Sequence, residues 1–252
     1  MPRRLKVTLA YDGTEFHGWQ VQPGLPTIQA ALEAVLAEIE NAPVAVAGSG
    51  RTDAGVHALA QVASFDLANP IPCDNLRRAM NRLLPASIRV ASVEEAEPNF
   101  HARLSATAKT YEYRIYRHEV CSPFEYRYVW HHPYPLDTRA MAGLATVFEG
   151  TRDFSLFAAS DERYTADYDM TRTIFSSELF DTGERLIYRV RGSGFLKHMV
   201  RNLVGTLIEA GRGNLPPDRW PDKCGHTVPA RGLFLVSVEY GAGLLDDVRE
   251  RS

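Results

Sequence analysis

The chain has 252 residues, and its 28 Lys and Arg against 31 Asp and Glu give a formal net charge of −3. Hydrophobic residues make up 45% and charged residues 23%, which is typical of a folded globular protein and excludes disordered, collagen-like and low-complexity chains. The small net charge excludes a general polycation of the histone type. It does not exclude a nucleic-acid-binding protein, because net charge averages over all faces of a molecule.

The cysteines and the N-terminus limit the compartment in which we expect this protein. Cys73, Cys121 and Cys224 are far apart and form no CxxC pair, so neither a disulfide framework nor a cysteine zinc site is expected. The basic N-terminus leads into an apolar run of strand length, which is too short for a signal peptide. No uncharged apolar run of 18 residues offers a membrane span. We therefore expect a cytoplasmic protein with no membrane partner.

The first half of the chain predicts the element order β-α-β-β-α-β. Apolar residues from Ile28 to Ile39 recur at helical spacing directly after Thr27. A second helical pattern has Asp74 as its expected N-cap and ends before Pro85. Short runs with strand composition cover residues 5–12, 44–48, 57–66 and 87–94.

The second half predicts the same order again. One helix opens at Asp137 and ends at Gly150, and another carries an apolar stripe from Met199 to Ile208 and ends at Gly211. The strands are expected at residues 108–117, 171–180, 185–193 and 233–240, and the segments 119–136 and 151–169 are expected to be loops.

This repeated order is that of the ferredoxin-like fold, so the predicted class is α+β with two ferredoxin-like halves. We expect the halves to join edge to edge in one extended, mixed and mainly antiparallel sheet, with a central cleft where ligands bind. The expected boundaries are residues 1–105 for the first half, 106–245 for the second and 246–252 for a tail. The fold alone names no function.

The segment from Gly48 to His57 is the most informative for chemistry. Its simplest interpretation is a glycine-rich hairpin turn. The glycine spacing does not fit a phosphate-binding loop, and Ala47 breaks the G-x-S-x-G pattern of a nucleophile elbow around Ser49. An Arg–Thr–Asp run between glycines remains unexplained. Arg51 beside Asp53 would hold that carboxylate ionised, as a nucleophile or a base requires.

Basic residues gather in two regions of this acidic chain. The stretch from Arg189 to Ile208 contains no acid, and Lys197 and Arg201 are expected on one face of the fourth helix. A second, looser cluster comprises Arg77, Arg78, Arg82, Arg89 and Arg103. A solvated basic face and a surface for RNA phosphates both fit this pattern. No metal site is expected, because His131 and His132 would point to opposite faces of a strand.

Several motifs together resemble the tRNA pseudouridine synthase A (TruA) family. They are Gly-Arg-Thr-Asp-Ala-Gly-Val-His at 50–57, Tyr-Asp-Gly-Thr at 11–14, Gly-Trp-Gln at 18–20, Lys-Thr-Tyr-Glu-Tyr at 109–113, Gly-Phe-Leu at 194–196, His-Met-Val-Arg-Asn at 198–202 and Pro-Ala-Arg-Gly-Leu at 229–233. They follow one another over nearly the whole chain, which makes the match specific. Lys197, Val228 and the tail after Gly241 depart from the family pattern.

The resemblance implies the pseudouridine synthase fold and a homodimer that binds the anticodon arm of tRNA. It also implies isomerisation of uridine to pseudouridine at tRNA positions 38, 39 and 40 with neither a cofactor nor a metal. By resemblance, Asp53 is the catalytic acid beside C1′ of the ribose, and Arg51 and Arg201 surround it. Tyr111 would stack on the base, and Lys197 and His198 adjoin the substrate.

Two alternatives remain open from the sequence. One is an RNA-binding module without catalysis, although no RNP1-like run of aromatic residues is present. The other is a nucleotide-dependent or hydrolytic enzyme that uses Ser49 and His57 of the glycine-rich loop.

Overall fold

The computed structural model describes residues 2–241. The tail expected at 246–252 and the last residues of the second half therefore lie outside the described residues. In chain order the main elements are β1 (Arg3–Tyr11), α1 (Ile28–Glu40), β2 (Ala47–Gly48), β3 (His57–Leu67), α2 (Cys73–Leu83), β4 (Ile88–Glu95), β5 (Ala106–Tyr116), β6 (Trp130–His131), α3 (Thr138–Val147), β7 (Gly150–Asp153), β8 (Thr171–Asp181), β9 (Arg185–Gly192), α4 (Met199–Gly211) and β10 (Leu233–Tyr240).

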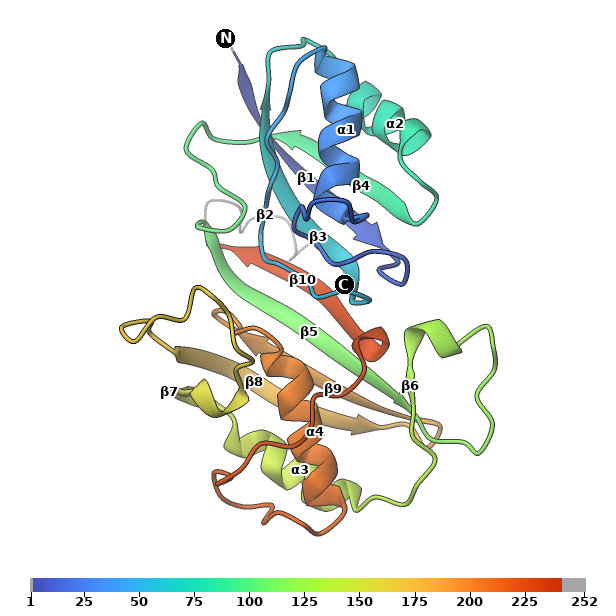
Figure 1. The fold of residues 1–252 in the computed structure, drawn as a ribbon, viewed down its shortest axis with the longest axis vertical. Helices are drawn as coiled ribbons and strands as arrows, with labels where there is room; N and C mark the ends of the chain where they lie inside the picture. The colour runs from blue at the N-terminus through green and yellow to red at the C-terminus, as the bar shows by residue number, and fades with distance from the viewer. Residues whose placement is uncertain (1, 242–252) are drawn as a thin grey trace, which may run out of the picture.

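All described strands belong to one sheet with the order β4-β1-β3-β10-β5-β9-β8-β7, while β2 pairs with β3 and β6 with β5 (Figure 1). Each half has the strand order of a ferredoxin-like unit: β4-β1-β3-β2 in the first and β10-β5-β9-β8 in the second. The halves meet where β10 pairs in parallel with β3, through Phe234 with His57 and Leu235 with Ala58. The other ladders around this junction are antiparallel. The predicted fold class is confirmed.

The helices begin where short polar side chains can satisfy free backbone N–H groups. The Thr27 hydroxyl accepts a hydrogen bond from the Ala30 N–H, and the Asp137 carboxylate accepts one from the Ala140 N–H. The prediction that Asp74 caps α2 is wrong. This helix begins at Cys73 after Pro72, two residues before the start that an Asp74 cap would give, so Asp74 lies inside the first turn and favours the helix only through its charge.

Strand boundaries differ from the prediction in three places. The strand expected at 44–48 is reduced to Ala47–Gly48, because β2 pairs with β3 only opposite Ser64 and Ala63. The short strands β6 and β7 occupy segments at 119–136 and 151–169 that were expected to be loops. The third helix ends at Val147 and not at Gly150, which has a positive φ of 100° and begins β7.

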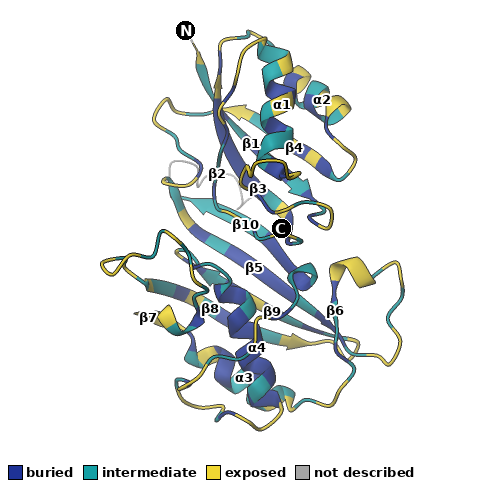
Figure 2. Ribbon diagram, viewed as in Figure 1, coloured by how far each residue is buried: buried dark blue, intermediate teal, exposed yellow. Residues whose placement is uncertain are grey.

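The buried residues form a continuous core between the sheet and its helices (Figure 2). Helices α1 and α2 cover the first half, and α3 and α4 cover the second (Figure 1). Successive side chains of a strand point to opposite faces, so Tyr111 and Tyr113 of β5 lie on the face opposite to that of Glu112. Within residues 2–241, no helix is long and apolar enough to cross a membrane.

Candidate active site

A cleft of about 900 Å³ lies where the two halves meet. Its lining includes the loop between β2 and β3, which we call the Asp53 loop (residues 49–56), and Tyr111 of β5 and Leu233 of β10. The segment before α4 contributes Phe195 to His198. Across the part of the chain that the structure describes, no three His, Cys, Asp or Glu side chains are grouped to hold a metal ion.

Hydrogen bonds among buried groups fix the position of the Asp53 loop. The Ser49 hydroxyl donates to Oε1 of Gln61 at 2.6 Å, and the Gln61 amide donates to the Gly50 carbonyl at 3.0 Å. The Thr52 hydroxyl shares a hydrogen bond of 2.8 Å with the hydroxyl of Tyr11. Ser49 is fully buried. This arrangement argues against the alternative in which Ser49 is a nucleophile, because its buried hydroxyl is already engaged by Gln61.

His57, the residue that directly follows the Asp53 loop, also helps to hold the surrounding loops together. Its Nδ1 accepts a hydrogen bond from the Gly13 N–H at 3.1 Å, and its Nε2 lies 3.0 Å from the carbonyl of Arg127. Burial lowers the pKa of His57 despite the nearby Asp12 carboxylate. The ring is therefore neutral at pH 7 and joins three loops instead of acting as a base in the cleft.

Close packing explains two of the glycines in these loops. A Cβ on Gly13 would lie 2.0 Å from the Val56 carbonyl oxygen, and a Cβ on Gly48 would lie 2.4 Å from the Trp19 ring. Trp19 is only 3% exposed, as expected for a loop tryptophan that packs on the core, and its backbone N–H donates to the Thr52 carbonyl at 3.0 Å. The segment 12–20 therefore packs against the Asp53 loop and stabilises it.

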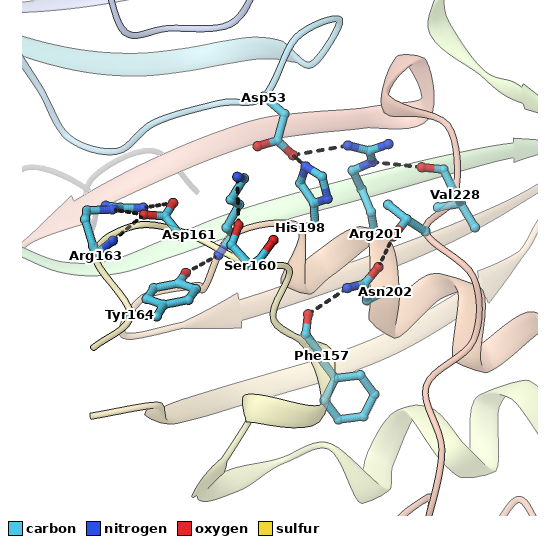
Figure 3. Close-up of polar contacts among 12 residues, drawn as sticks. Asp53, Phe157, Ser160, Asp161, Arg163, Tyr164, His198, Arg201, Asn202 and Val228 are labelled. Atoms are coloured by element: carbon cyan, nitrogen blue, oxygen red, sulfur yellow. Dashed lines mark hydrogen bonds and ion pairs between the residues drawn. The ribbon is translucent and has the colours of Figure 1, made fainter. Parts of the chain in front are cut away.

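The Asp53 carboxylate faces the start of α4 (Figure 3). Its Oδ2 lies 3.3 Å from Nη1 of Arg201 and 3.6 Å from Nε2 of His198. Arg201 is oriented by a second hydrogen bond, from its Nε to the Val228 carbonyl at 2.8 Å. Burial lowers the pKa of His198 more strongly than Asp53 raises it, so Arg201 supplies the permanent positive charge at this carboxylate.

Tyr111 lies in the same cleft, on the floor formed by β5. It is 7% exposed and packs edge-to-face on Phe195, with ring centres 5.1 Å apart. Burial raises the pKa of its hydroxyl, and the nearby Tyr11 and Asp53 raise it further. Tyr111 is therefore a neutral phenol at pH 7, a group that can stack on an uncharged base beside Asp53.

Known proteins of similar sequence identify the family of this chain. The chain matches the family described as "tRNA pseudouridine synthase" over residues 8–104 and 144–241. It is 64% identical to the tRNA pseudouridine synthase A of Solibacter usitatus over 94% of this chain and 100% of that one. The chain belongs to the tRNA pseudouridine synthase family.

Other similarities are more distant. The tRNA pseudouridine synthase A of Brevibacillus brevis is 42% identical over 94% of this chain and 100% of its own. A solved structure titled "Crystal Structure of a Cbf5-Nop10-Gar1 Complex" shows 12% identity and a TM-score of 0.36, covering 91% of this chain and 57% of that one. As a pseudouridine synthase the protein is an isomerase.

Two residues of this pseudouridine synthase lie elsewhere than the sequence predicted. Within residues 2–241 Arg51 makes no ion pair with Asp53; it is exposed at the cleft, close to Arg163 and Arg103. Lys197 does not share a helix face with Arg201, because α4 begins only at Met199 after a left-handed residue, His198. Instead, the Lys197 ammonium donates to the Ser160 carbonyl at 2.9 Å.

The acid-free stretch after Arg189 is not a continuous basic surface. Arg189 pairs with Glu112 and Arg191 with Glu239, each at 2.6 Å, on the face of the sheet opposite to Tyr111. These acids come from β5 and β10, which are distant in sequence. The two strand arginines are therefore neutralised, and the cationic lining of the cleft comes from other residues.

A second loop of this pseudouridine synthase contributes residues that the sequence did not single out. Between β7 and β8, Arg163 forms a two-bond ion pair with Asp161 at 2.7 and 2.8 Å (Figure 3). In the same loop Tyr164 and Tyr168 pack on each other. All four line the cleft. The available signal was the content of Tyr, Asp and Arg, which is unusual for a plain connection. Lys109 of β5 belongs to the motif at 109–113 but was not expected to be a site residue, and it too lines the cleft.

Proposed function

We propose that this protein isomerises uridine to pseudouridine at positions 38, 39 and 40 in the anticodon arm of tRNA, with Asp53 as its catalytic residue and without a cofactor. The family relationship supports tRNA uridine as the substrate. The observation that carries the assignment of Asp53 is its place in the cleft, within ion-pair distance of Arg201 and beside Tyr111.

The reaction breaks the bond between C1′ of the ribose and N1 of uracil and forms a bond from C1′ to C5. The proton on C5 leaves to solvent, and N1 gains a proton, so the product is an isomer of the substrate. An ionised carboxylate beside C1′ serves this chemistry either by attacking that carbon or by removing a sugar proton. The Arg201 guanidinium lies 3.3 Å from Oδ2 of Asp53 and can hold this carboxylate in position in either route.

The target uridine leaves its stack before it reaches Asp53, since C1′ and C5 are otherwise covered by neighbouring bases. In this proposal Tyr111 stacks on the displaced uracil from the floor of the cleft. Arg51, Lys197 and His198 contact the RNA around it, and their positions in the cleft lining support this assignment.

We further propose that the protein acts in the cytoplasm as a homodimer that binds the anticodon arm. Sedimentation of the protein alone and with tRNA would test the assembly: a mass of two chains is expected at micromolar concentration. A single-chain mass in both samples would contradict it.

Release of tritium from tRNA labelled at uridine C5 tests the proposed chemistry. Wild-type protein should release label to water. Asp53→Asn should abolish release while keeping tRNA affinity within about tenfold, or roughly 1.4 kcal/mol. Asp222→Asn, an exposed acid outside the cleft, is the matched control and should release label normally.

The same measurement decides against the remaining alternative. A non-catalytic RNA-binding module would bind tRNA without releasing label. Full release by Asp53→Asn would instead show that another residue acts on C1′.

A further inference from the structure

Lys109 presents an ammonium group in the cleft that the proposed chemistry does not use. It lies on β5 two residues before Tyr111, so both side chains point to the same face of the sheet, about 7 Å apart along the strand. Among the described residues, no hydrogen bond or ion pair reaches its Nζ. Burial lowers its pKa to about 8, with a smaller contribution from the positive charge of Arg103.

Gly50 of the Asp53 loop leaves room for the Lys109 side chain, because glycine has no Cβ. A Cβ on Gly50 would lie 3.3 Å from Nζ and 3.6 Å from Cε of Lys109. The end of the lysine side chain therefore lies against the loop that carries Asp53, three residues before it. The Lys109 ammonium group and the Asp53 carboxylate thus line the same cleft.

The charges around Lys109 favour a phosphate group of the RNA as its ligand, and not an uncharged part of the base. Arg103 lies close enough to disfavour the positive charge on both Lys109 and Arg51, so three cations approach one another. Asp161, the acid nearest to Arg51, is already engaged by Arg163. Like charges that are held together without counter-ions are stabilised when a phosphate binds between them.

We propose that Lys109 binds one of the two phosphates that flank the target uridine and so positions its ribose at Asp53. This inference rests on the proposed function, since it takes the RNA to lie across the cleft with the uridine at Asp53. The ammonium is protonated at pH 7 and needs no proton transfer to bind a phosphate. Lys109 is thus a positioning residue for the reaction.

A binding cycle tests this contact without relying on turnover. Synthetic tRNAs carry a neutral methylphosphonate at the phosphate 5′ or 3′ of the target uridine, and dissociation constants are measured for protein with Lys109 and with Lys109→Met. With Lys109, one of the two methylphosphonates should weaken binding about tenfold. With Lys109→Met, the same replacement should change affinity by less than about twofold, because the partner of that phosphate is already gone.

Two further variants make the result specific. Lys109→Arg keeps the positive charge and should restore sensitivity to the methylphosphonate. Lys223→Met removes an exposed lysine outside the cleft and should keep full sensitivity. Circular dichroism verifies that each variant is folded, and Lys109→Gln, which also removes the charge but keeps a polar side chain, takes the place of Lys109→Met if that variant does not fold.

Equal losses from the methylphosphonate with and without Lys109, or no loss at either position, would overturn the proposal. That outcome is distinct from a failure of the proposed function, which would appear as tritium release by Asp53→Asn or as absence of release by wild-type protein.

Discussion

Among single side chains, Arg201 connects the Asp53 carboxylate to the backbone of the second half. Its Nη1 faces Asp53 and its Nε donates to the Val228 carbonyl, so the planar guanidinium is fixed at two edges. Arg201→Lys retains the charge but makes only one of these contacts. We expect kcat to fall about 100-fold, because a carboxylate displaced by about 1 Å loses its alignment with C1′.

Single-turnover tritium release would measure this loss, with tRNA affinity determined in parallel. Arg219→Lys, at an exposed site outside the cleft, is the matched control. If Arg201→Lys weakened only the affinity and left kcat unchanged, Arg201 would be an RNA contact and not a partner of Asp53.

Lys109 also has a consequence for stability. Its pKa falls from 10.5 in the unfolded chain to about 8 in the folded one, so the charged form is disfavoured by folding. At pH 7 both states are protonated and the folded state bears the full cost. This cost shrinks as the pH rises from 8 to 10.5, because the folded state then holds fewer protons than the unfolded one.

Lys109→Met should therefore raise the melting temperature at pH 7 by a few degrees, at about 2–4 °C per kcal/mol. The gain should decline between pH 8 and 10.5. Arg103 and the other charged groups of the cleft are unchanged in the variant; they are Arg51, Asp53, His101, Asp161, Arg163, Arg172, Lys197 and His198. Thermal unfolding at several pH values is the measurement, and a lower melting temperature at pH 7 would contradict the predicted cost.

At the level of elements, the start of α4 depends on one unusual residue. His198 has φ of 60° and ψ of 0°, the left-handed conformation that turns the chain from Lys197 into the helix. Asn adopts this conformation readily, whereas a β-branched residue does not. His198→Val should destabilise the protein by about 1–2 kcal/mol, and His198→Asn by much less. Thermal unfolding compares the two, and equal losses would show that the imidazole contacts and not the backbone set the stability.

Periodic sequence patterns predicted the long elements but not the caps or the shortest strands. Apolar residues at helical spacing predicted α1, α3 and α4, because each helix buries one stripe on the sheet. The ends were less exact: α3 stops three residues before Gly150, and α4 begins only after Lys197. The prediction for Asp74 was wrong because a cap depends on the local turn, and α2 begins after Pro72, two residues before the start that an Asp74 cap would give. The two-residue strands β2 and β6 have no periodicity of their own. They exist only because a longer strand, β3 or β5, lies beside them.

At the scale of the whole molecule, the order of elements predicted both ferredoxin-like halves, and the motifs placed Asp53, Tyr111 and Arg201 together. The resemblance named both Arg51 and Arg201 as neighbours of Asp53, and only Arg201 pairs with it. Arg51 is two residues from Asp53 yet makes no ion pair with it, whereas Arg201 is in the other half and does. The long-range pairs Arg189–Glu112 and Arg191–Glu239 form only because β5, β9 and β10 are neighbours in the sheet.

This pairing explains how a chain of net charge −3 can bind tRNA. Six Lys and Arg but only two Asp line the cleft: Arg51, Arg103, Lys109, Arg163, Arg172 and Lys197 against Asp53 and Asp161. The cations of the opposite face are neutralised by Glu112 and Glu239. Among residues 2–241, the lining of the cleft therefore carries an excess of positive charge that phosphates can approach.

A pair of arginine variants tests this distribution. Arg51 is exposed at the cleft without an ion pair, whereas Arg189 is paired with Glu112 on the other face. Each phosphate contact contributes roughly −0.7 to the slope of log affinity against log salt concentration for single-stranded RNA. Arg51→Gln should flatten the slope by about that amount and weaken tRNA binding, while Arg189→Gln should leave the slope unchanged. Binding measured from 50 to 300 mM KCl is sufficient, and a flatter slope for Arg189→Gln would mean that tRNA also reaches the opposite face of the sheet.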